Sequence, residues 1–281
     1  MRVLVTGAAG FIGSNLAERL RERGDTVVGL DSFDAFYPRA VKERNLARLL
    51  GDGGFQLHEG DLRNPAQVAQ AVRGVDAVVH LAALAGVRPS LLDPVRFYEV
   101  NVMGTLHLLE ACRGQGIRRV VFASSSSVYG LDSQVPFRES DPCQTPLSPY
   151  AASKRAGELT AWNEHHLHGL GITALRLFTV YGPRQRPDLA IHKFTRLIAT
   201  GQPIELFGDG STSRDYTWVG DIVDGIVAAL DQQGRDATPA YRVYNLDGSQ
   251  TTSLRELVDL IAAALGRAPV IEWKPEQPGD M

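Results

Sequence analysis

Apolar residues recur along the chain with two alternating periods. Short runs rich in Val, Ile and Leu are each followed by a longer segment in which apolar positions have helical spacing. The expected strands cover residues 2–7, 26–31, 55–61, 76–82, 118–124, 172–178 and 241–246. Helical spacing is clearest over residues 11–23, 94–112, 189–200 and 220–230. This alternation predicts an α/β fold with a Rossmann-like, doubly wound parallel sheet joined by crossover helices.

The alternation stops near Tyr181, where a stretch rich in Pro and Gly begins. We expect residues 181–218 and 248–281 to form a smaller C-terminal substrate-binding lobe. Residues 1–180 would form the dinucleotide-binding domain, and 219–247 would return to it. The two parts should therefore interleave along the chain.

Composition excludes several classes of protein. The 281 residues are 44% apolar and 22% charged, with a formal charge of -3 and no single-sign run long enough to indicate a nucleic-acid arm or an acidic tail. The expected partners are small molecules or a second copy of the chain, with neither nucleic acid nor a membrane among them. No segment has the length of a membrane span, and the N-terminus runs directly into a strand. Cys112 and Cys143 lack the spacing of a metal site or a secreted disulfide framework. A cytoplasmic protein that binds small molecules is expected.

Three glycines follow the first expected strand. Gly7, Gly10 and Gly13 have the spacing GxxGxxG and precede a helical segment. Glycine lets the backbone approach a pyrophosphate, whose charge the free amides of a helix N-terminus can bind. The next strand ends in Asp31, where a carboxylate would accept hydrogen bonds from a ribose 2′-hydroxyl and repel a 2′-phosphate. The pattern predicts a site for NAD rather than NADP; a tight turn beside an ordinary strand-end Asp is the simpler alternative.

A tyrosine and a lysine share one face of another expected helix. Tyr150 and Lys154 are four residues apart, a pairing expected about 0.1 times by chance in this composition. To act as a base near neutrality, a tyrosine must lower its pKa from about 10 by about three units, or about 4 kcal/mol. An ammonium about 4 Å away supplies roughly that much at an effective dielectric near 20. The pair predicts a tyrosine base assisted by a lysine; the alternative is a helix-start aromatic beside a solvated charge.

Four serines, residues 124–127, end the fifth expected strand about twenty residues before Tyr150. Ligands of open α/β sheets bind at the carboxyl ends of the strands. Although serine runs are commonly plain loops, we expect these hydroxyls to face the ligand crevice.

Together these motifs resemble the extended short-chain dehydrogenase/reductase superfamily, and within it the nucleotide-sugar 4-epimerases. The likeness covers essentially the whole chain. It rests on TGAAGFIG, HLAALAGVRPS, NVMGT, SSSSVYG, the Tyr150-xxx-Lys154 pair, RLFTVYGPRQRPD, GDGSTSRDYTWVGDI and the terminal QPGD. It implies that NAD stays bound while Tyr150 removes the proton of the sugar 4-hydroxyl and C4 passes a hydride to the nicotinamide. The 4-keto sugar then turns over, and the hydride returns to its other face.

The resemblance also implies which residues act. It makes Ser125, Tyr150 and Lys154 catalytic, with Ser125 bonding the C4 oxygen. Besides Tyr150 and Lys154, the expected cofactor contacts are Gly7, Gly10, Phe11, Ile12, Gly13, Asp31, Asp61, Leu62, Leu81, Ala82, Ala83 and Asn101. The expected substrate contacts are Arg88, Ser126, Ser127, Thr179, Arg186, Arg214, Gln277 and Asp280. Asn101 could equally be a satisfied structural residue, and relatives usually continue some tens of residues past QPGD, which leaves Gln277 and Asp280 open.

The residues beside the expected base favour one reaction over its relatives. Nucleotide-sugar dehydratases carry an Asp-Glu pair after the catalytic hydroxyl, and UDP-glucuronate decarboxylases carry a Glu before VYG; this chain has Ser126 and Ser127 there. A serine cannot donate a proton at neutral pH as a carboxylic acid can. An epimerase is therefore expected. FTVYGPRQRPD and AGVRPS most resemble UDP-glucuronate 4-epimerases, whereas UDP-glucose 4-epimerases usually have Asn where this chain has Thr179.

Other functions remain open at this point. UDP-glucose could be the substrate, and a cofactor-binding regulator without catalysis or an NADPH-dependent carbonyl reductase could share the same fold. Metal binding is not expected, because the histidines of residues 165–168 lie at a polar helix end. The resemblance implies a homodimer joined through the helices of 94–112 and 150–168, although burial of these helices against the sheet would give the same pattern.

Overall fold

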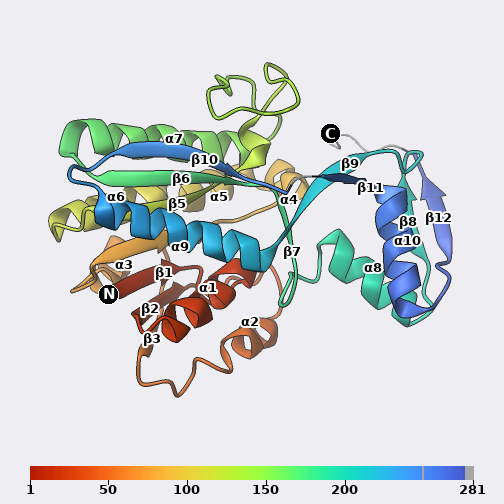
Figure 1. Ribbon diagram of the computed structural model, residues 1–281, viewed down its shortest axis with the longest axis horizontal. Helices are drawn as coiled ribbons and strands as arrows, with labels where there is room; N and C mark the ends of the chain where they lie inside the picture. The colour runs from red at the N-terminus through yellow and green to blue at the C-terminus, as the bar shows by residue number, and fades with distance from the viewer. Residues whose placement is uncertain (249, 276–281) are drawn as a thin grey trace.

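Seven parallel strands form the main sheet of the computed structural model, which describes residues 1–248 and 250–275 (Figure 1). The strands are β1 (Arg2–Thr6), β2 (Thr26–Asp31), β3 (Phe55–Glu59), β4 (Ala77–His80), β5 (Arg119–Ser125), β6 (Gly171–Leu177) and β10 (Tyr241–Leu246). Their order is β10-β6-β5-β4-β1-β2-β3, and every neighbouring pair is parallel. The predicted Rossmann-like α/β fold is confirmed.

Helices cover both faces of this sheet, which explains why its central strands are apolar throughout. One face carries α1 (Phe11–Glu22) and α9 (Val219–Arg235), which pack into one buried cluster with β1 and β5. The other carries α3 (Pro65–Ala71), α6 (Gly104–Gly114) and α7 (Pro149–His168), which pack into a second cluster. Three further helices are α2 (Arg39–Leu46), α4 (Val87–Leu92) and α5 (Pro94–Tyr98). No helix among the described residues is long and apolar enough to cross a membrane.

The helix expected over residues 94–112 is not continuous. Helix α5 passes into a π-helical segment, η1 (Glu99–Met103), before α6 begins. A π-turn inserts one extra residue without disturbing the apolar spacing on either side, so the sequence pattern could not reveal it. Asn101 lies in this segment, with its side chain buried.

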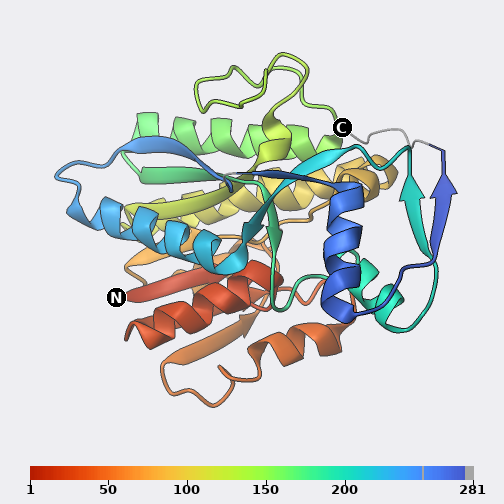
Figure 2. The ribbon, with the colours of Figure 1, turned by 45° about the vertical axis from the view of Figure 1, so that its right-hand side comes forward.

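A smaller unit lies beyond the carboxyl ends of the main strands (Figures 1 and 2). Its three-stranded sheet contains β7 (Thr179–Tyr181), β9 (Ser213–Trp218) and β11 (Thr251–Ser253), and its two-stranded sheet contains β8 (Ile204–Phe207) and β12 (Ile271–Lys274). Helices α8 (Ala190–Ala199) and α10 (Leu254–Leu265) pack on these strands through one cluster of buried aliphatic side chains. Strand β7 follows β6 after a single residue, and so connects the main sheet to the smaller unit at the crevice.

Candidate active site

The turn between β1 and α1 is shaped by its three glycines. Gly7 has φ +71°, a conformation that favours glycine, and its amide donates to the carbonyl of Leu30 at 2.7 Å. A Cβ on Gly13 would lie 2.1 Å from the oxygen of Gly7, so only glycine lets α1 approach the turn this closely. Helix α1 begins after Gly10 without a side-chain cap. Its first amides are therefore available to an anionic group such as a pyrophosphate.

The carboxylate of Asp31 stands at the end of β2, as expected, and is almost completely buried. It accepts hydrogen bonds from the amides of Ala9 at 3.0 Å and Phe33 at 2.8 Å. The ammonium of Lys42 lies 3.3 Å from the same carboxylate and lines the same cavity. Lys42 was not predicted, because it comes from a short helix outside any recognisable motif. A fixed carboxylate at this point suits the hydroxyls of an adenosine ribose.

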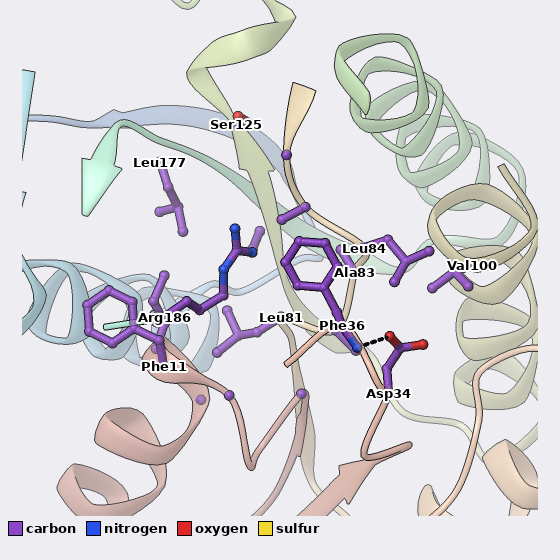
Figure 3. Close-up of a pocket in the computed structure, with 18 of the residues that line it drawn as sticks. Phe11, Asp34, Phe36, Leu81, Ala83, Leu84, Val100, Ser125, Leu177 and Arg186 are labelled. Atoms are coloured by element: carbon purple, nitrogen blue, oxygen red, sulfur yellow. Dashed lines mark hydrogen bonds between the residues drawn. The ribbon is translucent and has the colours of Figure 1, made fainter. Parts of the chain in front are cut away.

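A single cavity of about 430 Å³ lies between this turn, the carboxyl ends of the main strands and the smaller unit. Predicted site residues that line it are Gly7, Gly10, Phe11, Ile12, Gly13, Asp31, Asp61, Leu62, Leu81, Ala82, Ala83, Ser125, Ser126, Ser127, Tyr150, Lys154, Thr179 and Arg186. Figure 3 shows Phe11, Leu81, Ala83, Ser125 and Arg186 around this space. The glycine turn, the uncapped helix and the ribose-side carboxylate make one end of the cavity fit a dinucleotide.

Several predicted contacts do not line the cavity. Asn101 is buried behind it: its amide nitrogen donates to the carbonyl of Leu84 and to the hydroxyl of Ser153, each at 2.9 Å. Its side-chain oxygen accepts from the Leu84 amide at 2.8 Å. Because Leu84 lines the cavity, the bonds of Asn101 fix the cavity wall and join it to α7.

The predicted substrate contacts Arg88 and Arg214 also lie outside the cavity lining. The guanidinium of Arg88 on α4 lies 5.4 Å from the ring centroid of Phe207 on β8, and neither residue lines the cavity. The guanidinium of Arg214 donates to the carbonyl of Ser213 at 2.9 Å. Gln277 and Asp280 lie outside the described residues.

Helix α7 brings Tyr150 and Lys154 to the cavity. Its N-terminus is fixed by Ser148, whose hydroxyl oxygen accepts from the amide of Ala151 at 3.1 Å. The Lys154 ammonium donates to the carbonyl of Ala123 on β5 at 2.7 Å, and burial lowers its pKa to about 8. The ammonium is therefore bound to the residue of β5 that directly precedes Ser124 and Ser125.

The pKa of Tyr150 differs from the expectation that Lys154 would lower it. Burial raises the pKa of the phenol, while a hydrogen bond with Ser125 and the charge of Arg186 lower it by less. The lysine instead bonds to the backbone of β5. The i, i+4 spacing places both residues on one face of the helix but does not specify the distance between the ammonium and the phenol oxygen. Further positive charge near the phenol is needed before Tyr150 can act as a base at neutral pH.

The hydroxyls of Ser126 and Ser127 lie in a short 3₁₀ turn, η2 (Ser126–Val128), directly after β5. The Ser125 hydroxyl oxygen accepts from the amide of Ser127 at 3.1 Å, which fixes the start of this turn. Ser126, Ser127, Thr179 and Arg186 line the same cavity as Tyr150. They can bind a polar or anionic group next to the base.

Arg186 enters the cavity from the loop after β7. Its guanidinium binds Asp188 at 2.9 Å and lies 5.2 Å from the ring centroid of Phe36. Figure 3 shows Arg186 and Phe36 in the cavity. Phe36, Asp34 and Tyr37 also line the cavity, and sequence reasoning missed all three. They come from an irregular loop after β2 whose letters match no motif, so only the fold brings them to the site.

The chain is similar to known proteins of one enzyme family. The sequence model of the NAD dependent epimerase/dehydratase family matches residues 3–246. A UDP-glucuronate 4-epimerase of Arabidopsis thaliana is 43% identical over 92% of this chain, which spans 63% of the length of that relative. A UDP-glucuronate 4-epimerase of Thermodesulfobacterium geofontis is 39% identical, with 96% of this chain and 82% of the relative covered.

A solved structure has the same fold. The UDP-glucuronic acid 4-epimerase of Bacillus cereus, determined with UDP-glucuronic acid and NAD, superposes with a TM-score of 0.93 at 35% identity. The alignment covers 100% of this chain and 88% of that one.

Proposed function

Because the chain belongs to the NAD-dependent epimerase/dehydratase family, we propose that it is a UDP-glucuronate 4-epimerase, which interconverts UDP-glucuronate and UDP-galacturonate. The observation that carries the proposal is the grouping of Tyr150 and Ser125 with four potential carboxylate ligands in one cavity. The relatives with this activity support it. In this proposal residues 1–180 and 219–247 bind NAD, and residues 181–218 and 248–281 bind the sugar nucleotide.

Tyr150 is the proposed proton acceptor for the sugar 4-hydroxyl. Ser125, whose hydroxyl acts on the pKa of the phenol, would bond the C4 oxygen and so align it with the base. When bound, NAD accepts the C4 hydride and returns it, and its oxidised ring carries the positive charge that the phenol requires. Lys154 anchors α7 to β5 and keeps a second positive charge at the site. Asp31 and the glycine turn would hold the adenosine end.

The remaining polar groups suit a sugar acid. Oxidation at C4 makes UDP-glucuronate a β-keto acid, which loses CO₂ when its carboxylate stands perpendicular to the ketone. Ser126, Ser127 and Thr179 can fix the rotation of the carboxylate through hydrogen bonds, and Arg186 can stabilise its negative charge. No carboxylic acid stands at the serine positions to donate a proton for elimination, which supports epimerisation over dehydration.

The test of this part compares kcat/KM for UDP-glucuronate and UDP-glucose in the wild type, Arg186→Ala and Thr179→Ala. The acid should be the better substrate, and each variant should lose activity or release more UDP-pentose. Arg196→Ala is the matched control, because Arg196 is exposed on α8 and does not line the cavity. A wild-type preference for UDP-glucose would contradict the choice of sugar.

The proposal includes a homodimer. Exposed apolar side chains gather on α5, η1 and α7: Val95 is 68%, Met103 47%, Leu159 55% and Trp162 46% exposed. Apolar surface of this kind on adjacent helices is typical of an interface. Light scattering should give the mass of two chains, and Leu159→Glu combined with Trp162→Glu should give the mass of one.

We also place the protein in the cytoplasm, which its two buried free cysteines support.

A further inference from the structure

A fully buried carboxylate lies one turn beyond Lys154 on α7. Glu158 accepts a hydrogen bond from the hydroxyl of Ser124 at 2.6 Å. Arg176 on β6 binds both of its oxygens, through Nε and Nη2, at 2.9 Å each, and Arg155 adds a bond at 2.8 Å. Every oxygen of the carboxylate is therefore bound, and its charge is matched by arginine.

The same arginine continues the network toward the serine turn. Arg176 Nη1 donates to the hydroxyl of Tyr129 at 2.9 Å, and this hydroxyl donates to Oδ1 of Asn245 at 2.6 Å. The ring of Phe137 stacks on Tyr129 with 4.5 Å between centroids. Tyr129 directly follows the turn that carries Ser126 and Ser127. Both ends of the stretch 124–129 are thus bound to one buried ion pair.

Two side chains of α7 hold consecutive residues of β5. Lys154 binds the carbonyl of Ala123, and Glu158 binds the hydroxyl of Ser124. Ser125 comes next in the strand. The spacing of one helical turn on α7 is matched to the end of β5, and the match sets where Ser125 lies relative to Tyr150 on the same helix.

We propose that Glu158 and Arg176 are positioning residues of the active site, which fix the end of β5 and the serine turn against α7 so that Ser125 meets Tyr150. The inference rests on the proposed function. Stability alone is a poor reason for such a pair, because burying two charges costs as much as their attraction returns and apolar residues often serve as well. Its value lies in the geometry that it imposes on both neighbouring strands.

The charge of Glu158 also acts on Lys154. Burial lowers the pKa of Lys154, and the Glu158 carboxylate raises it again in part. His80 on β4 is a further titratable group on which the ammonium acts, and burial lowers the pKa of His80 to about 3, so that it stays neutral. Without the carboxylate, Arg176 would be an unpaired positive charge close by. Lys154 would then lose its proton at lower pH.

The test is Glu158→Gln, with Glu164→Gln as the matched control. Glu164 is a buried carboxylate on the same helix, paired with Arg113 at 3.3 Å, and among the described residues its side chain makes no hydrogen bond to β5. Glu158→Gln should lower kcat about tenfold or more, leave KM within about threefold, and move the alkaline limb of the kcat profile to lower pH by about half a unit or more. The control should change none of these.

A second readout does not depend on turnover. Amide hydrogen exchange over residues 124–130 of the NAD-loaded protein should be faster in Glu158→Gln and in the milder Tyr129→Phe than in the wild type and Glu164→Gln. Should the wild type convert no UDP-sugar, the proposed function fails and the exchange experiment alone decides the inference. Unchanged exchange, or an unchanged alkaline limb in an active Glu158→Gln enzyme, would overturn it.

Discussion

Gly13→Ala tests whether the close approach of α1 to the glycine turn is required for NAD binding. The added Cβ would lie 2.1 Å from the oxygen of Gly7 and 3.0 Å from the Cα of Ala8, both backbone atoms that no rotamer change can move away. The helix must therefore shift by roughly 1 Å, well beyond van der Waals tolerance. Overpacking of this kind costs about 1–3 kcal/mol, or about 5- to 150-fold if it appears entirely in the Kd for NAD.

The control is Gly114→Ala, because a Cβ there meets nothing within 4 Å and the residue is the last of α6. Because alanine has a higher helix propensity than glycine, this variant should have an unchanged free energy of unfolding or one raised by up to about 1 kcal/mol. Calorimetric titration with NAD and thermal unfolding are measured for both variants. Gly13→Ala should bind NAD more weakly, unfold at a lower temperature, or both. If its Kd and Tm equal those of Gly114→Ala, the steric reasoning is refuted.

Three further predictions concern the reacting groups. Tyr150→Phe should still bind UDP-glucuronate by calorimetry but lose about 10² to 10⁴ in kcat, and near-normal turnover would remove Tyr150 from the mechanism. The wild type should bind NAD more tightly than NADP, and Asp31→Ala should reduce that preference; tighter NADP binding by the wild type would refute the assignment of Asp31. Activity should fall above about pH 8, since the Lys154 ammonium is charged below that pKa and neutral above it, and Lys154→Arg should flatten this limb of the kcat profile; an unchanged limb would show that another group causes it.

The fold could be read from the sequence because its signals are local and repeated. Most strands of the main sheet, such as β1 and β5, are short runs rich in Val, Ile and Leu, and a helix of clear period follows several of them. The π-helical insertion at Glu99–Met103 could not be read, since the apolar spacing continues on both sides of it.

Some residues of the candidate site could be predicted from motifs, and others could not. Gly7, Asp31 and Tyr150 stand in motifs whose spacing follows from the chemistry, and the structure brings them to one cavity. Lys42 and Phe36 reach it from segments with no such spacing, and only the assembled fold reveals them. The pKa of Tyr150 depends on burial and on distances across the site, which a helical repeat does not contain.

One measurement tests the central claim most directly. The purified protein is incubated with UDP-glucuronate and, in parallel, with UDP-glucose, and the products are separated by chromatography. We predict that UDP-glucuronate is converted to UDP-galacturonate without net consumption of NAD, with little UDP-pentose, and faster than UDP-glucose is converted to UDP-galactose. Faster conversion of UDP-glucose, UDP-pentose as the main product, or no conversion of the acid would contradict the account.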